Sequence, residues 1–214
     1  MDAKQIKKIY SNLAKEYNSI IKNKAKYIAY KKISKLTIKH LNKKNARILD
    51  LGCGTGLSSI EFLKKGYKVT GVDIAKGMIS EAKKLPFEKF VCQNIETPLN
   101  VSDDSFDAVT LVGVMEFIEN PTQLFKEVNK KLIQEGVFAL TLPKKMSKNS
   151  QLNIKSYYKK EIEKIIKTTN FKIIETHKFF GYRKNNENVE YYGYILKKNE
   201  IQNKKICFTN KNFL

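Results

Sequence analysis

The chain has 214 residues, of which 42% are hydrophobic, and its 41 Lys and Arg residues against 21 Asp and Glu residues give a formal net charge of +20. These values fit one domain with a hydrophobic core, and the longest apolar runs are far shorter than the roughly 20 residues that span a bilayer. Three cysteines without paired spacing exclude a disulfide framework and a CxxC zinc site, so no metal is expected, and the Lys-rich first thirty residues lack a signal-peptide stretch, which favours a cytoplasmic protein.

The first 45 residues predict two amphipathic helices. Apolar residues recur at helical spacing from Ile6 to Tyr17 and again from Ile28 to Leu41, and the stretch from Asn18 to Asn23 interrupts them.

From Arg47 onward, short β-rich runs alternate with helical stretches, which is typical of a parallel sheet with helices on both faces. The last two β-rich runs are separated by residues 181–188 without a helix, so they must pair antiparallel. We therefore predict an α/β fold, a doubly wound Rossmann-like seven-stranded sheet that is mostly parallel, with an antiparallel edge hairpin and N-terminal helices. The predicted strands span 47–51, 68–72, 89–92, 106–112, 136–142, 171–180 and 189–197, and the later helices 57–65, 76–84, 121–133 and 156–169.

The excess positive charge lies at the two ends of the chain. Residues 1–47 carry a net +12, residues 48–142 a net −3 and residues 143–214 a net +11. A basic chain fits a nucleic acid or an anionic membrane surface. However, 39 of the 41 basic residues are Lys, whereas nucleic-acid readers favour Arg for bidentate contacts, and a genome rich in A and T produces the same bias. The composition therefore favours codon bias over nucleic-acid binding as the source of the lysines, and the nucleic-acid interpretation stays open.

A glycine-rich turn, Asp50-Leu51-Gly52-Cys53-Gly54-Thr55-Gly56, joins the first predicted strand to the next helix. Glycine accepts positive φ and lets a ligand approach the backbone, and the helix start offers free N–H groups. The second predicted strand ends at Asp73, where a carboxylate can accept from both hydroxyls of a ribose. Leu57 stands where a dinucleotide fingerprint requires glycine, and Asp50 brings negative charge, so the turn fits a cationic ligand better than a pyrophosphate.

These motifs resemble those of the class I S-adenosylmethionine-dependent methyltransferases, in particular the type 11 small-molecule enzymes, over roughly residues 10–142. The resemblance implies a methyltransferase with S-adenosyl-L-methionine as cofactor and S-adenosyl-L-homocysteine as product. It also implies a lid, because Tyr10 to Asn18 is similar to the family's Tyr-x-x-x-Ala-x-x-Tyr-Asp segment, with Asn18 in place of Asp. The alternative is that Tyr10 and Tyr17 only pack an amphipathic helix against the sheet. The cofactor contacts that it implies are Tyr17, Asp50, Gly52, Gly54, Gly56, Asp73 at the ribose, Ile74 and Met78 beside the adenine, Asn94 where the family commonly has Asp, Ile95, and Val112 beside the methionine part.

The same resemblance organises residues 1–198 as one methyltransferase domain. Residues 1–45 are then a helical lid or extension, residues 46–142 the cofactor-binding core, and residues 143–198 the acceptor-side region with the edge hairpin. Residues 199–214 are expected to be a polar C-terminal tail.

No catalytic residue is indicated, because Phe117 stands where many relatives carry His. His40 is expected at the surface or in packing, and His177 faces either the core or a substrate cleft. Glu116 is expected to cap or orient a group more than to catalyse. Tyr157 and Tyr158 either line an acceptor pocket or pack.

We expect in-line methyl transfer, driven by proximity, to a small-molecule acceptor with an O, N, S or C nucleophile and an apolar or aromatic body. One alternative is an RNA or DNA methyltransferase that uses the basic ends, although the chain lacks the Asn/Asp-Pro-Pro-Tyr/Phe motif and the Pro-Cys pair of such enzymes. A second alternative is a non-catalytic S-adenosylmethionine-binding protein. The oligomeric state is not indicated.

Overall fold

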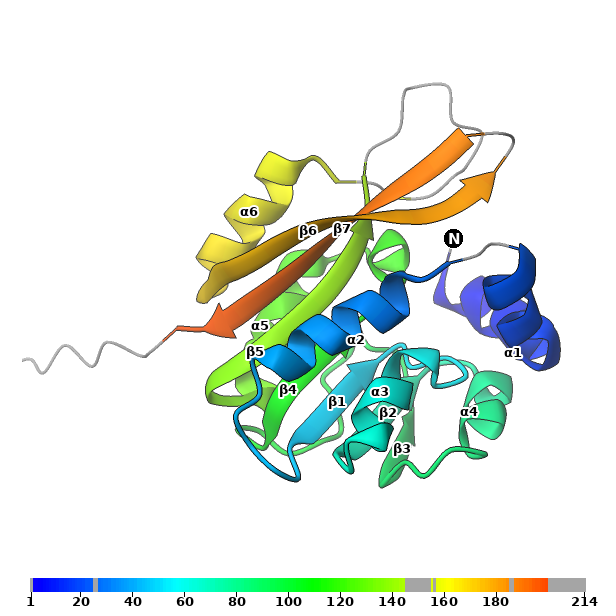
Figure 1. Cartoon of the computed structure of the whole chain (residues 1–214), viewed down its shortest axis with the longest axis horizontal. Coiled ribbons are helices and arrows are strands. Elements are labelled where there is room, and N and C mark those ends of the chain that lie inside the picture. The colour runs from blue at the N-terminus through cyan, green and yellow to red at the C-terminus, as the bar shows by residue number, and fades with distance from the viewer. Residues whose placement is uncertain (1, 25–26, 145–154, 156, 185–186, 200–214) are drawn as a thin grey trace, which may run out of the picture.

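A seven-stranded sheet forms the centre of the fold (Figure 1). The structure is a computed structural model that describes residues 2–24, 27–144, 155, 157–184 and 187–199. The strand order is β3-β2-β1-β4-β5-β7-β6. The first five strands in this order run parallel, and β7 pairs antiparallel with both β5 and β6, which confirms the expected fold class. The strands are β1 (Arg47–Leu51), β2 (Lys68–Asp73), β3 (Lys89–Cys92), β4 (Phe106–Leu111), β5 (Leu132–Pro143), β6 (Phe171–Lys184) and β7 (Glu187–Lys198).

Helices cover both faces of this sheet. The α-helices are α1 (Ala3–Ser19), α2 (Ala29–Lys39), α3 (Ile60–Lys64), α4 (Lys76–Ala82), α5 (Pro121–Lys131) and α6 (Lys159–Thr168). Short helical turns of other types are η1 (Ile20–Lys24), η2 (Leu57–Ser59) and η3 (Met115–Phe117).

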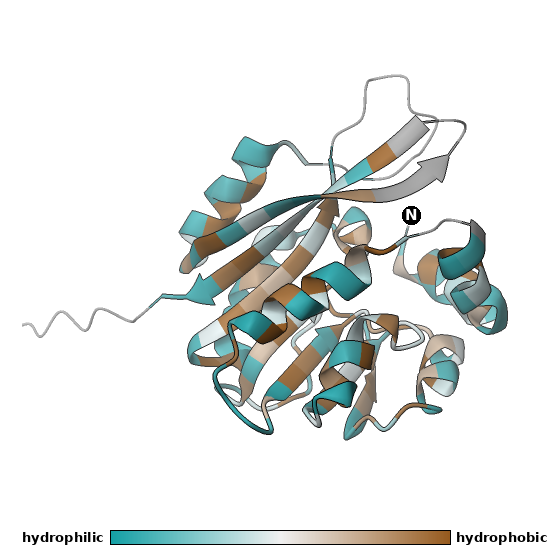
Figure 2. Cartoon of the chain, in the orientation of Figure 1, coloured by the Kyte–Doolittle hydropathy of each residue, from teal (hydrophilic) through white to brown (hydrophobic). Residues whose placement is uncertain are grey.

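Burial on both faces explains the apolar character of the central strands. Every residue of β4 and four of the five residues of β1 are buried, as expected for parallel strands between two helical layers. Figure 2 shows hydrophobic residues along these strands and hydrophilic residues on the outward sides of α2 and α6. One core cluster includes Phe125 of α5 and Ile162 of α6, and the other includes Ile33 of α2 and Phe62 of α3.

The first helix begins at a reciprocal cap and ends where the sequence pattern is interrupted. Asp2 Oδ1 accepts a hydrogen bond from the Gln5 N–H at 2.8 Å, and Gln5 Oε1 accepts one from the Asp2 N–H at 3.1 Å. After α1 the chain passes through the π-helical turn η1, so the expected break near Asn18 to Asn23 takes this form.

A glycine allows α1 to dock against α4. A Cβ atom built on Gly77, in the first turn of α4, would overlap the backbone carbonyl oxygen of Ser11 in α1. The absent side chain therefore lets the two helices approach closely. The contact places Tyr10 and Tyr17 of α1 against Met78, over the carboxyl ends of the strands.

The C-terminal hairpin is longer than predicted. Its ladder continues to the pair Lys184–Glu187, so β6 and β7 run through most of the 181–188 stretch that was expected to separate them. A register shift between Phe180 and Tyr182 accommodates this polar stretch, and backbone pairing needs no apolar side chains. β5 likewise begins at Leu132 instead of residue 136, because Leu132 pairs with Phe106. Beyond Asn199, the predicted tail lies outside the described residues, as does most of the loop before Tyr157.

Candidate cofactor and acceptor site

A cavity of about 490 Å³ opens at the carboxyl ends of β1, β2 and β4, where open α/β sheets bind their ligands. Its volume falls within the usual range for small-molecule sites, which is about 300 to 1,000 Å³. Residues from α1, the turns after the strands and η3 line it. The lining residues that the sequence predicted as cofactor contacts are Tyr17, Gly52, Gly54, Asp73, Ile74, Met78, Asn94, Ile95 and Val112.

The glycine turn brings its backbone to the cavity. Gly52, Gly54 and Gly56 have φ values of +67°, +52° and +87°, which side-chain-bearing residues rarely adopt. A Cβ atom on Gly54 would meet no heavy atom within 4 Å, so its face is open toward the cavity. Gly56 does not line the cavity, because it packs beside Leu85 and Phe87. It therefore shapes the turn, whereas Gly52 and Gly54 border the cavity.

The carboxylate of Asp73 holds the same turn in place. Its Oδ2 accepts from the Gly54 N–H at 2.9 Å, and its Oδ1 accepts from the Ala75 N–H at 2.8 Å. Burial raises the pKa of the Asp73 carboxyl, and these two hydrogen bonds oppose the rise. A carboxylate oxygen has more than one acceptor position, so Asp73 can hold the turn and still accept from a diol in the cavity.

Asp50, which the resemblance implies as a cofactor contact, belongs to a buried hydrogen-bond network. It is fully buried and does not line the cavity. Its Oδ2 accepts from the hydroxyls of Ser58 and Ser59, each at 2.6 Å, and its Oδ1 accepts from the Thr110 hydroxyl at 2.8 Å. Burial raises the pKa of the Asp50 carboxyl, although the three hydroxyls oppose the rise. Through these hydrogen bonds, Asp50 links β1 to β4 and to the turn after Gly56.

Aromatic side chains of α1 form one wall of the cavity. Tyr10 makes edge-on ring contacts with Tyr17 and Phe117, with centroid distances of 6.0 and 5.8 Å. Burial, followed by the charges of Glu116 and Asp73, raises the pKa of Tyr17 to about 12, so its hydroxyl stays protonated at neutral pH. The Thr55 hydroxyl donates to Asn18 Oδ1 at 2.6 Å and ties the end of α1 to the glycine turn.

The opposite wall follows β3. Asn94 Oδ1 accepts from the Glu96 N–H at 3.0 Å, and Asn94 and Ile95 line the cavity beside Ile74 and Met78. Glu96 Oε1 in turn accepts from the N–H groups of Glu119 and Asn120, both at 2.8 Å. This contact joins the turn after β3 to the start of α5 and closes the wall, a role that the sequence did not reveal.

A second, smaller cavity of about 50 Å³ adjoins the first. Both cavities are lined by Tyr17, Gly52, Gly54, Val112 and Gly113. The rest of the smaller cavity is lined by a mixture of aromatic, aliphatic and polar residues, which are Ile21, Tyr27, Tyr30, Cys53, Thr55, Leu57 and Ser58.

Glu116 is half-buried after the turn that follows β4, and it lines neither cavity. Glu116 Oε1 accepts a hydrogen bond from the hydroxyl of Tyr191 in β7 at 3.0 Å. The ring of Tyr191 contacts that of Tyr27 at a centroid distance of 5.4 Å. The sequence left Glu116 undecided and did not single out Tyr191, because a tyrosine in an alternating strand looks the same whether it packs or serves a site.

The other candidate residues lie elsewhere or serve packing. Tyr157 is buried, and its hydroxyl donates to the carbonyl oxygen of Ile118 at 3.0 Å, whereas Tyr158 is exposed. His40 and His177 both contact the carboxylate of Glu175, at 2.8 and 2.7 Å, and neither lines a cavity described above.

Cys53 and the arrangement of candidate metal ligands were also compared with the site. Burial raises the pKa of the Cys53 thiol well above its ordinary value. Within residues 2–24, 27–144, 155, 157–184 and 187–199, no three His, Cys, Asp or Glu side chains gather as a metal site.

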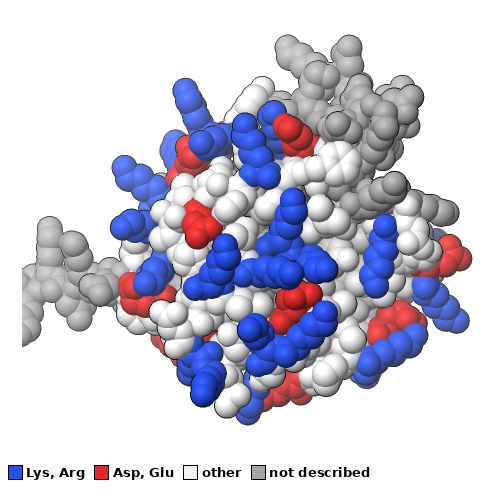
Figure 3. All heavy atoms as spheres, in the orientation of Figure 1, with Lys and Arg blue, Asp and Glu red and all other residues white. Residues whose placement is uncertain are grey.

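The charge of the large cavity is opposite to that of the chain as a whole. Its described lining includes four acidic residues, Asp2, Asp73, Glu96 and Glu119, and no Lys or Arg. The lysines instead project over the outer surface, where Figure 3 shows them interspersed with acidic residues. None of the helices in the described part of the chain combines the length and apolar character that a membrane span requires.

Comparison with known proteins relates residues 49–140 to a family described as a methyltransferase domain. A ubiquinone biosynthesis O-methyltransferase of Idiomarina loihiensis is 34% identical over 102 residues, which cover 45% of this chain and 42% of that protein. An uncharacterized protein of Methanocaldococcus jannaschii is 34% identical over 138 residues, covering 64% of this chain and 51% of that protein. The chain thus spans about half or less of the length of these relatives.

Solved structures share the fold at low sequence identity. The [4+2]-cyclase SpnF superposes with a TM-score of 0.76 at 15% identity, covering 92% of this chain and 96% of that one. The 1,6-didemethyltoxoflavin-N1-methyltransferase of Burkholderia thailandensis, solved with 1,6-didemethyltoxoflavin and S-adenosylhomocysteine, superposes with a TM-score of 0.70 at 15% identity, covering 91% and 88%. These two proteins bear different activities on one architecture, so the fold alone does not define the reaction.

Proposed function

We propose that the chain is a class I S-adenosylmethionine-dependent methyltransferase and that it transfers a methyl group from S-adenosylmethionine to a small-molecule acceptor. One observation carries the proposal: the open glycine turn and the carboxylate of Asp73 border the same cavity. The names of the relatives, which include O- and N-methyltransferases, support the reaction class.

The groups around the cavity fit the parts of this cofactor. Asp73 would accept from the ribose hydroxyls, and Asn94 with the apolar side chains of Ile74, Met78 and Ile95 would hold the adenine. Gly52, Gly54 and Val112 would lie along the methionine part, where Gly54 leaves open space. Tyr17 would cover the cofactor from α1.

The chemistry requires little more than alignment. When bound, the cofactor supplies a methyl group on a positively charged sulfur, which is already activated for displacement. The chain then has to hold a nucleophile in line with that methyl group, and such positioning can supply roughly 7 to 11 kcal/mol of the barrier. Acidic side chains around the cavity also favour a cationic ligand over an anionic one.

A small acceptor agrees better with the cavity than a nucleic acid does. A polynucleotide would have to bring its phosphates to a cavity lined by four acidic residues and, among the described residues, by no Lys or Arg. The apolar and aromatic side chains of Ile6, Phe117 and Ile118 instead favour an acceptor with an apolar or aromatic body. In this proposal residues 1–45 are the lid, residues 46–142 the cofactor-binding core and residues 143–198 the acceptor side.

Substitution of Asp73 tests the cofactor site. We expect Asp73→Asn to weaken S-adenosylhomocysteine binding at least tenfold, because an amide replaces the carboxylate that would accept from both hydroxyls. Isothermal titration calorimetry with S-adenosylhomocysteine measures the affinity, and transfer of radiolabelled methyl groups from S-adenosylmethionine measures the reaction.

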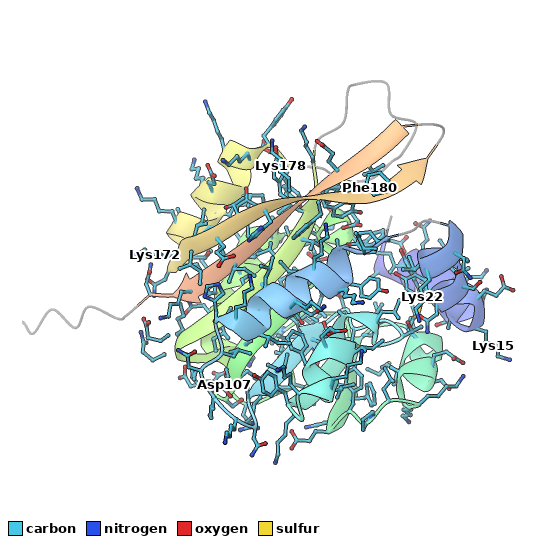
Figure 4. All side chains as sticks on the ribbon, in the orientation of Figure 1. Lys15, Lys22, Asp107, Lys172, Lys178 and Phe180 are labelled. Atoms are coloured by element: carbon cyan, nitrogen blue, oxygen red, sulfur yellow. The ribbon has the colours of Figure 1, made fainter. Side chains whose placement is uncertain are left out.

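Asp107→Asn is the matched control. Asp107 is also a buried acid that accepts a backbone hydrogen bond, from the Arg47 N–H at 2.7 Å. It lies at the end of the sheet away from α1 (Figure 4). This variant should bind S-adenosylhomocysteine as the wild type does. Equal affinities of wild type and Asp73→Asn would contradict the assignment of the cavity as the cofactor site.

A further inference from the structure

A further cavity, of about 230 Å³, lies at the amino ends of the parallel strands, and we call it the amino-end cavity. The strand residues that line it are Arg47, Thr70, Lys89 and Phe106. Three of these are the first residues of β1, β3 and β4, whereas the large cavity lies at the carboxyl ends of the strands. The amino-end cavity is thus separate from the proposed cofactor site. Its volume is below the usual range of about 300 to 1,000 Å³, so it suits a small ligand.

This cavity exists because one crossover of the sheet contains no helix. The connections from β1 to β2, from β2 to β3 and from β4 to β5 contain α3, α4 and α5. Residues 93–105, all of which the structure describes, join β3 to β4 without a helix. Val101, Ser102 and Ser105 of this connection line the cavity. At this place a loop covers the sheet, and strand side chains below the loop face a cavity.

Thr70 brings a buried hydroxyl to the amino-end cavity. It is the third residue of β2, is only 5% exposed, and pairs across the strands with Lys89, which also lines the cavity. Its hydroxyl forms no hydrogen bond with any residue that the structure describes. Buried hydroxyl groups normally have a partner, so this one indicates that a molecule in the cavity completes its hydrogen bonding.

Arg47 brings a positively charged group whose orientation is fixed. Its guanidinium carbon lies 5.6 Å from the centroid of the Phe106 ring, which is a cation–π contact. Neither the Arg47 guanidinium nor the Lys89 ammonium forms an ion pair with a described residue. The planar N–H donors of arginine match the oxygens of a phosphate, so Arg47 can bind an oxoanion through two hydrogen bonds.

The acidic side chains around the cavity already have lysine partners. Glu88, which lines the cavity, contacts Lys68 at 3.3 Å. The two acids of the adjoining connection are paired in the same way, as Asp103–Lys131 at 2.6 Å and Asp104–Lys198 at 2.8 Å. The two cations that line the cavity are therefore the charged groups left without a partner, and they favour an anionic ligand.

We propose that the amino-end cavity is a second ligand site, which binds a small molecule through its phosphate group. Arg47 donates two N–H groups to the phosphate oxygens, Lys89 supplies a second positive charge, and the Thr70 hydroxyl donates to a third oxygen. A phosphate monoester offers three acceptor oxygens and a charge of about −1.5 to −2 at neutral pH, so it matches this set of groups. The site does not depend on methyl transfer.

A single phosphate agrees better with this cavity than a polynucleotide does. Affinity for a polynucleotide comes from many contacts between lysines or arginines and phosphates. Two cations line the amino-end cavity, and the acids Glu88, Asp103 and Asp104 lie in or beside it. These acids would repel the phosphates that follow the first one along a strand of nucleic acid.

Nuclear magnetic resonance on the whole chain, with glycerol 3-phosphate as the probe, tests the site. A titration at constant ionic strength should move the backbone amide signals of Thr70, Lys89 and Ser102 until they saturate, whereas sodium chloride should leave them in place. We expect Arg47→Gln to weaken binding at least tenfold, because hydrogen bonds to charged groups are the strong ones. Lys44→Gln is the matched control, because Lys44 is exposed three residues before Arg47 and does not line the cavity. Its affinity should stay within twofold of wild type.

Thr70→Val separates ligand binding from a structural role. A methyl group replaces the hydroxyl, so the affinity for glycerol 3-phosphate should fall about threefold or more. The hydroxyl has no partner among the described residues, so the free energy of unfolding without ligand should not fall. A loss of stability without ligand, together with an unchanged affinity, would overturn the role of Thr70 in the site.

Two further probes identify the source of the phosphate. Inorganic phosphate should move the same amide signals, and a short single-stranded RNA without a terminal phosphate should not displace glycerol 3-phosphate. Displacement by the RNA would assign the cavity to a polynucleotide and overturn the small-molecule ligand. Signals that never saturate, or equal affinities of wild type and Arg47→Gln, would overturn the site itself.

Discussion

At the residue scale, Gly54 and Gly66 form a natural pair for comparison. Both have positive φ, at +52° and +73°, and a Cβ atom on either would meet no heavy atom within 4 Å. They differ in position, because Gly54 borders the large cavity and Gly66 lies in the turn between α3 and β2. The backbone strain of a substitution is therefore similar at both sites, and only one of them adds atoms to the cavity.

We expect Gly54→Ala and Gly66→Ala each to lower the free energy of unfolding by about 1 kcal/mol, the usual penalty for a left-handed non-glycine residue. Only Gly54→Ala should weaken S-adenosylhomocysteine binding, by tenfold or more, because its methyl group would occupy space that the ligand needs. Denaturant titration and calorimetry measure the two effects. A similar affinity in both variants would show that the ligand does not approach this turn.

The hydrogen-bond partners of Asp50 could not be predicted from the sequence. The motif places an acid before the glycines, and the resemblance implied that it contacts the cofactor. Its hydroxyl partners include Thr110, which is 60 residues further along the chain on the neighbouring strand. Such a long-range partner becomes visible only when β1 and β4 are seen to pair. Asp73 differs because it ends its strand, so its place at the cavity follows from topology alone.

At the scale of elements, the position of α1 depends on Gly77. In an exposed helix, replacing Gly by Ala stabilises by up to about 1 kcal/mol. Here the added Cβ would overlap the carbonyl oxygen of Ser11, so the sign should reverse. Because α1 carries Tyr10 and Tyr17, displacement of this helix should also open the cavity.

We expect Gly77→Ala to weaken S-adenosylhomocysteine binding and to make α1 more sensitive to limited proteolysis, while the rest of the domain stays folded. Ser80→Ala is the control, because Ser80 is exposed on the same helix. Proteolysis followed by mass spectrometry locates the cleavage, and calorimetry gives the affinity. Unchanged affinity in Gly77→Ala would mean that the α1–α4 contact does not shape the site.

The elements themselves could be predicted to different degrees. The four strands up to Leu111 are close to their predicted bounds, and for β1, β2 and β4 the reason is that parallel strands buried on both faces are continuous apolar runs between turns. The extension of β6 and β7 could not be predicted, since residues 181–188 are mostly polar in sequence and lack the apolar alternation that indicates a strand. The site also contains one part that could be predicted from the sequence and one part that could not. The glycine turn is local in sequence, whereas Glu116 and Tyr191 meet across 75 residues.

At the scale of the whole molecule, the chain and its large cavity differ in the sign of their charge. The chain carries +20, and lysines are scattered among acidic and uncharged residues on the face that Figure 3 shows, but the described lining of the large cavity is acidic. The surface lysines would therefore attract polyanions, whereas the acidic cavity would attract a cationic ligand. Salt should affect them differently, because surface charges are screened far more than partly buried ones.

We expect raising the ionic strength from about 0.05 to 0.5 M to weaken any binding of single-stranded RNA steeply, as counterion release requires. The affinity for S-adenosylmethionine should change by less than about threefold over the same range, because Asp73, the carboxylate proposed to bind the ribose, is buried. Fluorescence anisotropy with a labelled oligonucleotide and calorimetry with the cofactor measure the two. A cofactor affinity that falls as steeply as RNA binding would place the cofactor on the exposed surface instead.

The acidic lining also bears on how quickly the site empties after each turnover. Methyl transfer converts a sulfonium into a neutral thioether, so the spent cofactor has one positive charge fewer than the fresh one. The four carboxylates of the cavity then lose part of their attraction for the ligand they hold. In the proposed reaction the cavity should therefore favour S-adenosylmethionine over S-adenosylhomocysteine, and calorimetry with both ligands measures this difference.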